Sequence, residues 1–176
     1  TPYKVFTPFY KKSSLKYDLI QSPLPAPKIK NLFKDKTSLP LKSFKLLPQH
    51  SWYKDVIRDW QVGETAAIEK LDLFLNTSIH NYKIGRDFPS LNSVSKLSPH
   101  IHFGEISPRQ IYHLLQKFKH SHNTEHFKKE LTWREFSYYL LFHFPDLPDE
   151  NFQSKFNNFP WGNDKKLLLA WQQGKT

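Results

Sequence analysis

The sequence predicts an all-α fold over residues 51–176, and two observations carry that prediction. Apolar residues recur at helical spacing along most of this region, whereas strand signals after residue 50 are weak. Two Ser-Pro pairs, Ser98-Pro99 and Ser107-Pro108, have the pattern of an N-cap serine followed by proline at the first helical position. The length of 176 residues is enough for one domain with a sizeable core.

Residues 1–50 differ in composition from the rest of the chain and are expected to form an extended, Lys- and Pro-rich linker. They hold seven of the 13 prolines, including the alternating Pro23, Pro25 and Pro27, a pattern typical of polyproline conformation. They also hold ten lysines, no arginine and two acids, so most of the net charge of +10 lies here. A solvated linker and a phosphate-binding arm explain this charge equally well. The aromatic run at residues 3–10 is expected to dock on another surface.

Each helix expected after residue 50 has its own signal. Gly63-Glu64-Thr65 opens a helix whose apolar positions have helical spacing: Ala67, Ile68, Leu71, Phe74 and Leu75. Residues 82–92 are expected to form a polar turn region. After Ser107-Pro108, a second helix has the inward stripe Ile111, Leu114, Leu115 and Phe118.

The C-terminal third is expected to hold two more helices. Residues 119–125 are rich in His and Lys and are expected to form a loop. A helix should follow from about His126 to His143 and end near Pro145. The next loop carries the aromatic residues Phe152, Phe156, Phe159 and Trp161, and a last helix should start around Asp164.

Composition excludes several classes of site. There is no cysteine, so disulfides and thiolate zinc sites are excluded. The histidines lack the spacing of a metal site and have no carboxylate placed to complete one. No run approaches the length of a membrane-spanning helix and no signal peptide is visible, so a cytoplasmic protein is expected. There is also no methionine, even at position 1, which favours a piece of a longer protein.

The segment Glu130–Phe136 has the most unusual pattern in the chain. On a helix, Glu130, Trp133 and Arg134 would share one face, with Phe127 one turn earlier on the same side. A charge pair and an indole on an inward stripe are costly unless a polar, aromatic ligand lies against them. The alternative is a solvated i,i+4 salt bridge beside a half-buried tryptophan, worth a few tenths of a kcal/mol.

A second candidate binding segment is Ser93–Pro99, a polar loop that leads into a helix. Free backbone N–H groups, hydroxyls and one lysine suit a phosphate or pyrophosphate, although a plain Ser-Pro cap has the same sequence. Tyr82 and Arg86 could stack and contact a phosphate, or could form an ordinary helix end.

Taken in order, six motifs of this chain resemble the DNA photolyase/cryptochrome family, most closely the bacterial class I cyclobutane pyrimidine dimer photolyases. The motifs are Lys4–Phe9, Gly63-Glu64 with Ala67, Leu71 and Phe74, Tyr82-x-x-x-Arg86-Asp87-x-Pro89, Ser95–Arg109, Glu130–Phe136 and Ala170–Thr176. The likeness implies a helical domain that binds a U-shaped FAD beside a hole for an extruded pyrimidine dimer.

The resemblance also implies roles for individual residues. FAD would be held by Tyr82, Val94, Ser95, Lys96, Leu97, Ser98, Phe127 and Arg134. Glu130 would hydrogen-bond the damaged bases, Trp133 would stack on them, and Arg86 would contact a DNA phosphate. Trp161 would belong to the electron-transfer chain that photoreduces the flavin. Family members often have Thr in place of Val94, which puts one hydroxyl contact in doubt. They often have Trp in place of Phe127.

The implied activity is light-dependent repair of pyrimidine dimers in double-stranded DNA by electron transfer from photoexcited reduced FAD. The family likeness divides the chain into the tail of an α/β antenna domain (1–12), an interdomain linker (13–50) and the N-terminal half of the FAD-binding domain (51–176). An antenna chromophore of folate or deazaflavin type would bind elsewhere in a full-length, monomeric, cytoplasmic bacterial enzyme. The isolated piece is expected to be inactive. The alternatives are a cryptochrome-like photoreceptor and a basic helical DNA-binding module without cofactor.

Overall fold

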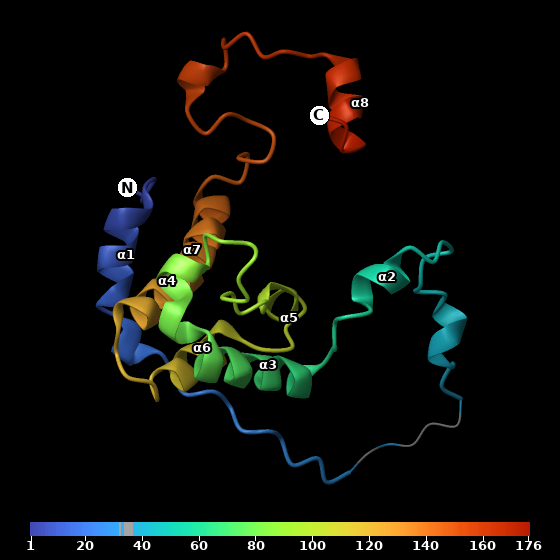
Figure 1. Ribbon diagram of the computed structural model, residues 1–176, viewed down its shortest axis with the longest axis vertical. Helices are drawn as coiled ribbons and strands as arrows, with labels where there is room; N and C mark the ends of the chain where they lie inside the picture. Colours follow the sequence, from blue (N-terminus) through green and yellow to red (C-terminus); the bar gives the residue numbers. More distant parts are fainter. Residues whose placement is uncertain (32, 34–36) are drawn as a thin grey trace.

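Helices make up all the regular structure in residues 1–31, 33 and 37–176, which the computed structural model describes, and no strand occurs there. The all-α prediction is therefore confirmed. Figure 1 shows a body built around α7, from which one arm with the short helix α2 and another with α8 extend. The α-helices are α1 (Phe6–Ser14), α2 (Tyr53–Ile57), α3 (Glu64–Thr77), α4 (Tyr82–Gly85), α5 (Ser98–His102), α6 (Pro108–Leu115), α7 (His122–His143) and α8 (Lys165–Gln172).

The core lies where α3, α4, α6 and α7 meet. Helix α3 starts after Gly63, whose φ of 105° is in the region that favours glycine. The buried apolar residues of α3 have the spacing that the sequence predicted: Ala67, Leu71, Phe74 and Leu75. They pack with apolar side chains from the other elements, namely Ile79, Tyr82, Leu97, Ile106, Ile111, Leu115 and Phe127. This core fixes α4 against α7, and both helices carry predicted site residues.

We expect Leu71→Ala to lower the free energy of unfolding by about 2–5 kcal/mol, because a fully buried leucine leaves a cavity when it is truncated. Leu71 has no exposed surface. Leu73 lies in the same helix and is 61% exposed, so Leu73→Ala is the matched control. Urea unfolding followed by circular dichroism measures both changes. Equal losses in the two variants would contradict this assignment of the core.

Two serine caps set the starts of α6 and α7. Ser107 accepts a hydrogen bond from the Gln110 N–H at 3.1 Å, and the Gln110 side chain accepts one from the Ser107 N–H, so the predicted cap is confirmed. Ser121 and Thr124 form the same reciprocal arrangement. Helix α7 therefore begins at His122 and not near His126, and most of the loop expected at 119–125 belongs to the helix. A threonine in place of the usual Glu or Gln hid this capping box.

The cap predicted for Ser98 is wrong. Leu97 occupies the N-cap position of α5, and no side-chain cap hydrogen bond forms there. The preceding residue, Lys96, has a φ of 52°, which turns the chain sharply before the helix. Leu97 is instead anchored by burial in the core, so packing and not a serine cap fixes this helix start.

The N-terminal aromatic run docks as expected, but as a helix and not as extended chain. Helix α1 packs along α7 (Figure 1), with Phe6 stacked on Trp133 and Phe9 against Phe136. Ordered packing continues past the predicted boundary at residue 12, because the Tyr17 hydroxyl lies 2.5 Å from that of Thr132 in α7. Aromatic burial against α7 outweighs the linker-like composition here. The rest of the predicted linker has little regular structure, and Leu32, Lys34, Asp35 and Lys36 lie outside the described residues.

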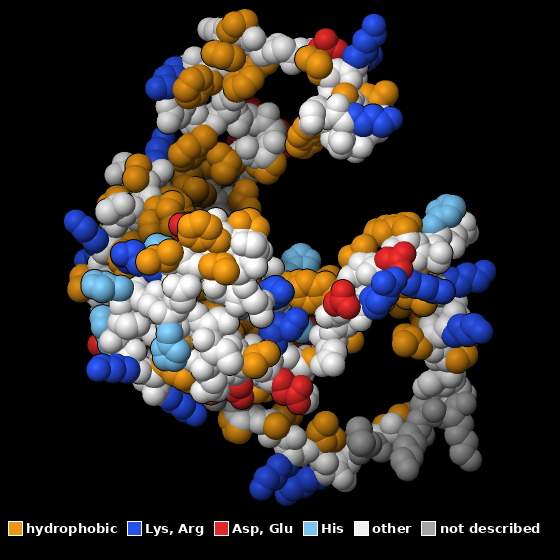
Figure 2. Space-filling view, viewed as in Figure 1, with side chains coloured by type: hydrophobic (Ala, Val, Ile, Leu, Met, Phe, Trp, Pro, Cys, Tyr) orange, Lys and Arg blue, Asp and Glu red, His pale blue; other side chains and the backbone are white. Residues whose placement is uncertain are grey.

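The C-terminal arm ends in α8, which starts where the sequence predicted. The Asp164 carboxylate accepts hydrogen bonds from the N–H groups of Lys166 and Leu167. Figure 2 shows hydrophobic side chains along this arm and an open hollow between it and the α2 arm. The exposed apolar residues of the arm include Phe159, Trp161, Leu167, Leu168, Leu169 and Trp171. No helix among the described residues is long and apolar enough to cross a membrane.

Candidate functional site

An aromatic cluster between α3, α4 and α7 forms the base of the candidate site. Tyr82 begins α4 and Phe127 lies in the second turn of α7, and both rings are buried. The Phe127 ring centroid lies 4.9 Å from that of Phe74 and 5.2 Å from that of Tyr82. Burial raises the pKa of the Tyr82 hydroxyl, so this group stays a neutral donor. The structure thus brings together two residues that the sequence predicted as cofactor contacts.

An ion pair joins α4 to α7 beside this cluster. Arg86, which directly follows α4, pairs with the Glu130 carboxylate, and both side chains are partly buried. The Arg86 guanidinium carbon also lies 5.6 Å from the centroid of the Tyr82 ring. The hydrogen bond to Glu130 raises the pKa of Arg86, so the guanidinium stays protonated. Two residues predicted to contact DNA therefore neutralise each other in the free protein.

The i,i+4 pair of Glu130 with Arg134 does not form. Arg134 Nη1 lies 2.7 Å from Glu135 Oε1, and the guanidinium carbon lies 4.7 Å from the Tyr138 ring centroid. Glu130 is already paired with Arg86, which approaches α7 from α4. Sequence spacing along α7 could not reveal this partner, because Arg86 lies 44 residues away in the chain.

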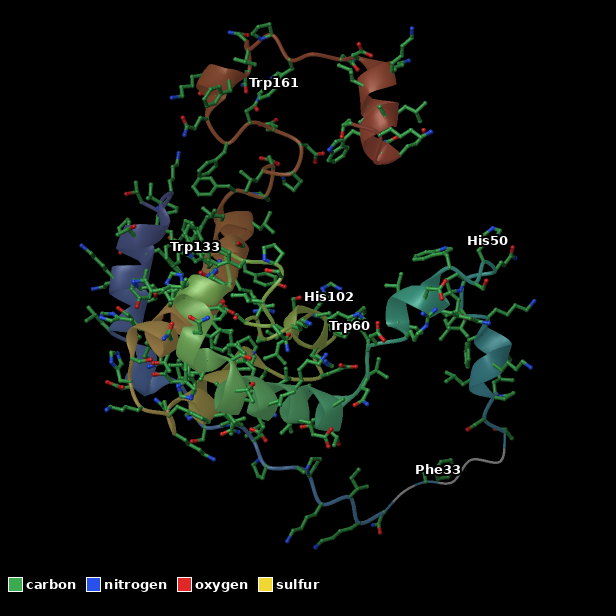
Figure 3. The ribbon with its side chains drawn as sticks, in the orientation of Figure 1. Phe33, His50, Trp60, His102, Trp133 and Trp161 are labelled. Atoms are coloured by element: carbon green, nitrogen blue, oxygen red, sulfur yellow. The ribbon has the colours of Figure 1, made fainter. Side chains whose placement is uncertain are left out.

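Trp133 lies one helical turn beyond Glu130 and is 44% exposed. Figure 3 shows it between α1 and α7. Its indole is stacked on Phe6 of α1, with ring centroids 3.6 Å apart and an interplanar angle of 9°. One face of the indole is therefore covered by protein, and part of the side chain is open to solvent.

The predicted phosphate loop lies next to Arg86 and not in a separate part of the fold. A cavity of about 260 Å³ is lined by Arg86, Phe88, Pro89, Ser90, Leu91, Asn92, Val94 and Lys96. Ser93 is buried against Gly85, where an added Cβ would lie 2.3 Å from the Ser93 hydroxyl oxygen. This close approach holds the loop on α4. Ser95 is partly buried, Leu97 is buried, and Lys96 and Ser98 are exposed.

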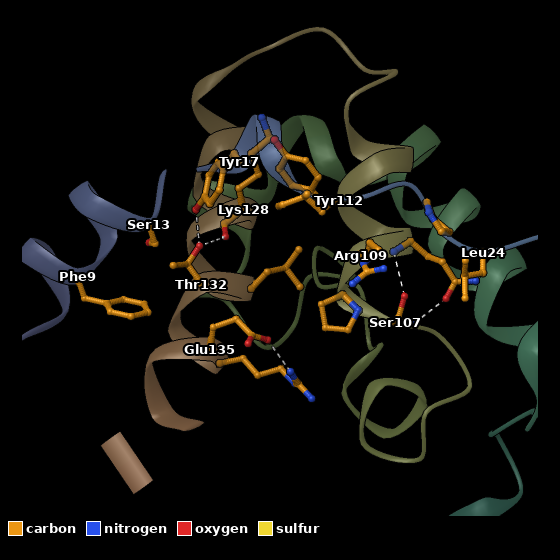
Figure 4. Close-up of a pocket in the computed structure, with 16 residues that line it drawn as sticks. Phe9, Ser13, Tyr17, Leu24, Ser107, Arg109, Tyr112, Lys128, Thr132 and Glu135 are labelled. Atoms are coloured by element: carbon orange, nitrogen blue, oxygen red, sulfur yellow. Dashed lines mark hydrogen bonds and ion pairs between the residues drawn. The ribbon is translucent and has the colours of Figure 1, made fainter. Parts of the chain in front are cut away.

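Arg134 lines a different and larger cavity, of about 670 Å³, between α1, α6 and α7 (Figure 4). Its polar lining includes Arg109, Lys128, Thr132 and Glu135, and Tyr17 and Tyr112 add aromatic surface. The structure therefore does not bring Arg134 to Tyr82 and Phe127. Trp161 is also separate from them: it is 63% exposed in the C-terminal arm, where its ring packs 4.7 Å from Phe159 (Figure 3).

Comparison with known proteins places these residues in a family. A family model described as the FAD binding domain of DNA photolyase matches residues 127–176. The deoxyribodipyrimidine photo-lyase of Agrobacterium fabrum is 40% identical over 99% of this chain, and that of Alkalihalophilus pseudofirmus is 33% identical over 100%. A crystal structure of a bacterial class III photolyase from Agrobacterium tumefaciens matches with a TM-score of 0.80 and 38% identity over 98% of the chain. The chain belongs to the DNA photolyase family.

The chain spans 37% of the length of each of these photolyases. The solved photolyase is a class III enzyme, whereas the motifs of this chain resemble those of class I. The class of this chain therefore stays a prediction. The segment matched by the family model includes most of α7, and the predicted phosphate loop lies beside Arg86, which pairs with Glu130 of α7. The sequence did not predict that Phe6 would contact Trp133 of the Glu130–Phe136 motif. The aromatic run at residues 3–10 predicted docking but not the partner ring.

A FAD-binding role for this photolyase segment can be tested against the residues present. The cations Lys96 and Arg86 line a cavity that suits a phosphate group. At about 260 Å³ the cavity is open to a phosphate-sized group and does not enclose a dinucleotide. The donor set therefore fits the phosphates of FAD, while the described residues leave much of its ring system without a wall. No group of three or more potential metal ligands occurs among them.

A buried histidine supports the segment that follows this loop. His100 Nδ1 lies 2.5 Å from Glu105 Oε2, and His100 is almost completely buried. The backbone N–H of Gly63 donates to the same carboxylate and, with His100, lowers the pKa of Glu105. Glu105 therefore ties the start of α3 to α5.

As the pH falls, we expect the wild type to lose stability more steeply than Glu105→Gln. The pKa of Glu105 is lower in the folded protein than in the unfolded one. Its contribution is therefore present above pH about 4.5 and is lost as the pH falls through the folded value. Melting temperatures between pH 7 and pH 3 measure the effect, with the exposed Glu69→Gln as control. Parallel pH profiles for wild type and Glu105→Gln would contradict it.

Proposed function

We propose that this chain supplies part of the FAD- and lesion-binding site of a deoxyribodipyrimidine photolyase. The carrying observation is that Arg86 pairs with Glu130 next to the cavity that Val94 and Lys96 help to line, and that Trp133 follows Glu130 by one turn of α7. A cation for a phosphate, a carboxylate for base edges and an exposed indole are three groups that suit an extruded pyrimidine dimer. Family membership supports the same assignment.

In this proposal, FAD in its reduced and photoexcited form supplies the electron that splits the cyclobutane ring. The residues of this chain bind and orient. Tyr82 and Phe127 support the cofactor side, and the segment Val94–Ser98 holds its phosphates. Arg134 is proposed as a further flavin contact, although in this structure it pairs with Glu135 and lines the separate cavity between α1, α6 and α7.

The DNA side of the site depends on an exchange of partners. Arg86 is held by Glu130 in the free protein. A DNA phosphate near the lesion competes for the Arg86 guanidinium, which binds phosphate bidentately. The Glu130 carboxylate is then available to hydrogen-bond the damaged bases. The ion pair thus holds the Glu130 side chain in place until substrate arrives.

The proposed partner is double-stranded DNA that contains pyrimidine dimers, bound by a monomer in the bacterial cytoplasm, where the chromosome lies. Trp161 is proposed to pass an electron toward the flavin. Its exposed position on the C-terminal arm suits the outer end of such a chain. A cryptochrome-like photoreceptor is the second candidate, and the carboxylate at Glu130 favours repair, because that position in cryptochromes and six-four photolyases tends to hold Gln or another residue.

Flavin content tests the cofactor assignment. The natural full-length protein, purified in the dark, is expected to carry FAD, detected by its near-ultraviolet and visible absorption bands. Residues 1–176 alone are expected to carry little or none. Lys96→Glu should lower the flavin content, because it reverses a charge at the proposed phosphate cavity. Lys70→Glu, in the middle of α3 beside Trp60, is the matched control. A flavin-free full-length protein would favour the cofactor-free DNA-binding module.

A further inference from the structure

The indole of Trp133 has a fixed backing on one face only. The Phe6 ring lies parallel to it within 9° at a centroid distance of 3.6 Å. Such a short distance leaves little lateral offset, so Phe6 covers that face of the indole. Since Trp133 is still 44% exposed, the solvent-accessible part is the opposite face and the ring edge. A flat ligand can therefore stack on one defined side only.

The helix that carries Phe6 is fastened to α7 on both sides of this contact. Toward the N-terminus, the Tyr3 N–H donates to the Tyr139 hydroxyl at 3.0 Å. Toward the C-terminus, the Tyr10 hydroxyl donates to the Glu125 carboxylate, and Lys129 Nζ lies 5.2 Å from the Tyr10 ring centroid. Phe6 thus lies between two attachments, which hold its helix turn against α7.

A third ring completes the setting of the indole. Phe136, which is buried in α7, meets Trp133 edge-on with centroids 5.9 Å apart and meets Phe6 at 5.8 Å. Rings packed face to face and edge to face leave a tryptophan few rotamers. The exposed face of Trp133 is therefore presented in one orientation before any ligand binds.

We propose that Phe6 is a positioning residue that orients the Trp133 indole for stacking on an extruded pyrimidine, so that Phe6, Trp133 and the base form one continuous stack. This proposal rests on the proposed function, because it takes the ligand of Trp133 to be a base of damaged DNA. It adds that the N-terminal helix, outside the segment that the family model matches, takes part in lesion recognition.

The physical reason is the entropy of binding. An indole that is free to rotate must be ordered when the base stacks on it, and ordering one such side chain costs about 0.5–1.5 kcal/mol. Phe6 removes that cost in advance. Its loss is expected to weaken binding to dimer-containing DNA roughly three- to tenfold, with little effect on intact duplex, where no base is extruded.

The test compares two variants of one helix in the natural full-length protein. Phe6→Leu removes the stacked ring, while Phe9→Leu removes a ring of α1 that contacts Phe136 and Tyr139 but not Trp133. Equilibrium binding is measured with matched oligonucleotides with and without a thymine dimer. Phe6→Leu should lower the preference for damaged DNA, Phe9→Leu should keep it, and Phe6→Tyr should restore it.

Melting temperatures of the variants separate positioning from stability. If Phe6→Leu keeps the wild-type preference while Trp133→Ala loses it, Phe6 has only a packing role and the inference is overturned. The same holds if Phe9→Leu reduces the preference as much at equal stability. If the wild type itself does not prefer dimer-containing DNA, the proposed function fails and not this inference alone.

Discussion

Glu130→Ala in the natural full-length protein is expected to slow dimer splitting about ten- to hundredfold while FAD content stays unchanged. A hydrogen bond to a charged group contributes about 1.5–3 kcal/mol, which corresponds to that range when it acts on the reacting bases. Glu130 pairs with Arg86 but does not itself line the phosphate cavity, so cofactor binding should persist. Repair under blue light at saturating substrate, with flavin absorbance as the loading control, measures both quantities.

Glu135→Ala is the matched control for this change. Glu135 lies in the same helix and pairs with Arg134, so its removal also leaves a cation without a partner. Repair by Glu135→Ala should stay much closer to the wild-type rate. Glu130→Gln should retain part of the rate, because an amide still donates and accepts. An unchanged rate in Glu130→Ala would remove this carboxylate from the mechanism.

Trp133→Ala is expected to weaken binding to dimer-containing DNA about 5- to 100-fold and to leave binding to intact DNA nearly unchanged. Stacking of a base on an aromatic side chain contributes about 1–3 kcal/mol, and only an extruded base can reach the exposed indole face. Intact duplex is held mainly through phosphate contacts, which do not involve Trp133. Fluorescence anisotropy with labelled duplexes measures the two affinities.

A control for this variant is Trp52→Ala, which removes an exposed indole from the arm that carries α2. It should change neither affinity, because Trp52 lies apart from the candidate site. An equal loss for damaged and intact DNA in Trp133→Ala would reduce Trp133 to a residue that packs α1 on α7. One titration series with damaged and intact duplexes distinguishes a selective loss from an equal loss.

The helices of the body could be predicted because their apolar faces are periodic. Leu71 and Phe74 follow the 3.6-residue repeat of a buried helix, and Ser107-Pro108 has an unambiguous cap. The start of α7 was missed because its capping box uses Thr124 where the usual pattern has Glu or Gln. Helix α1 was missed because Pro8, Lys11 and Lys12 resemble linker composition, and only tertiary packing on α7 reveals its role.

Individual candidate residues could be named from the sequence, but the pairings between them could not. Spacing on α7 suggested Glu130 with Arg134, whereas the fold brings in Arg86 from α4. Long-range contacts of this kind depend on how α4 docks on α7 through Tyr82 and Phe127, and no local pattern encodes that geometry. The stack of Phe6 on Trp133 is of the same kind, since it joins residues 127 positions apart.

The most direct measurement for the central claim is repair of a thymine dimer in a defined oligonucleotide by the natural full-length protein under blue light. Loss of the dimer is followed by the recovery of absorbance at the wavelength of intact thymine, with the flavin reduced beforehand. The site built from Arg86, Glu130 and Trp133 predicts restoration of thymine in the light and none in the dark. A protein that carries reduced FAD but leaves the dimer intact in the light would contradict the repair function and favour a photoreceptor.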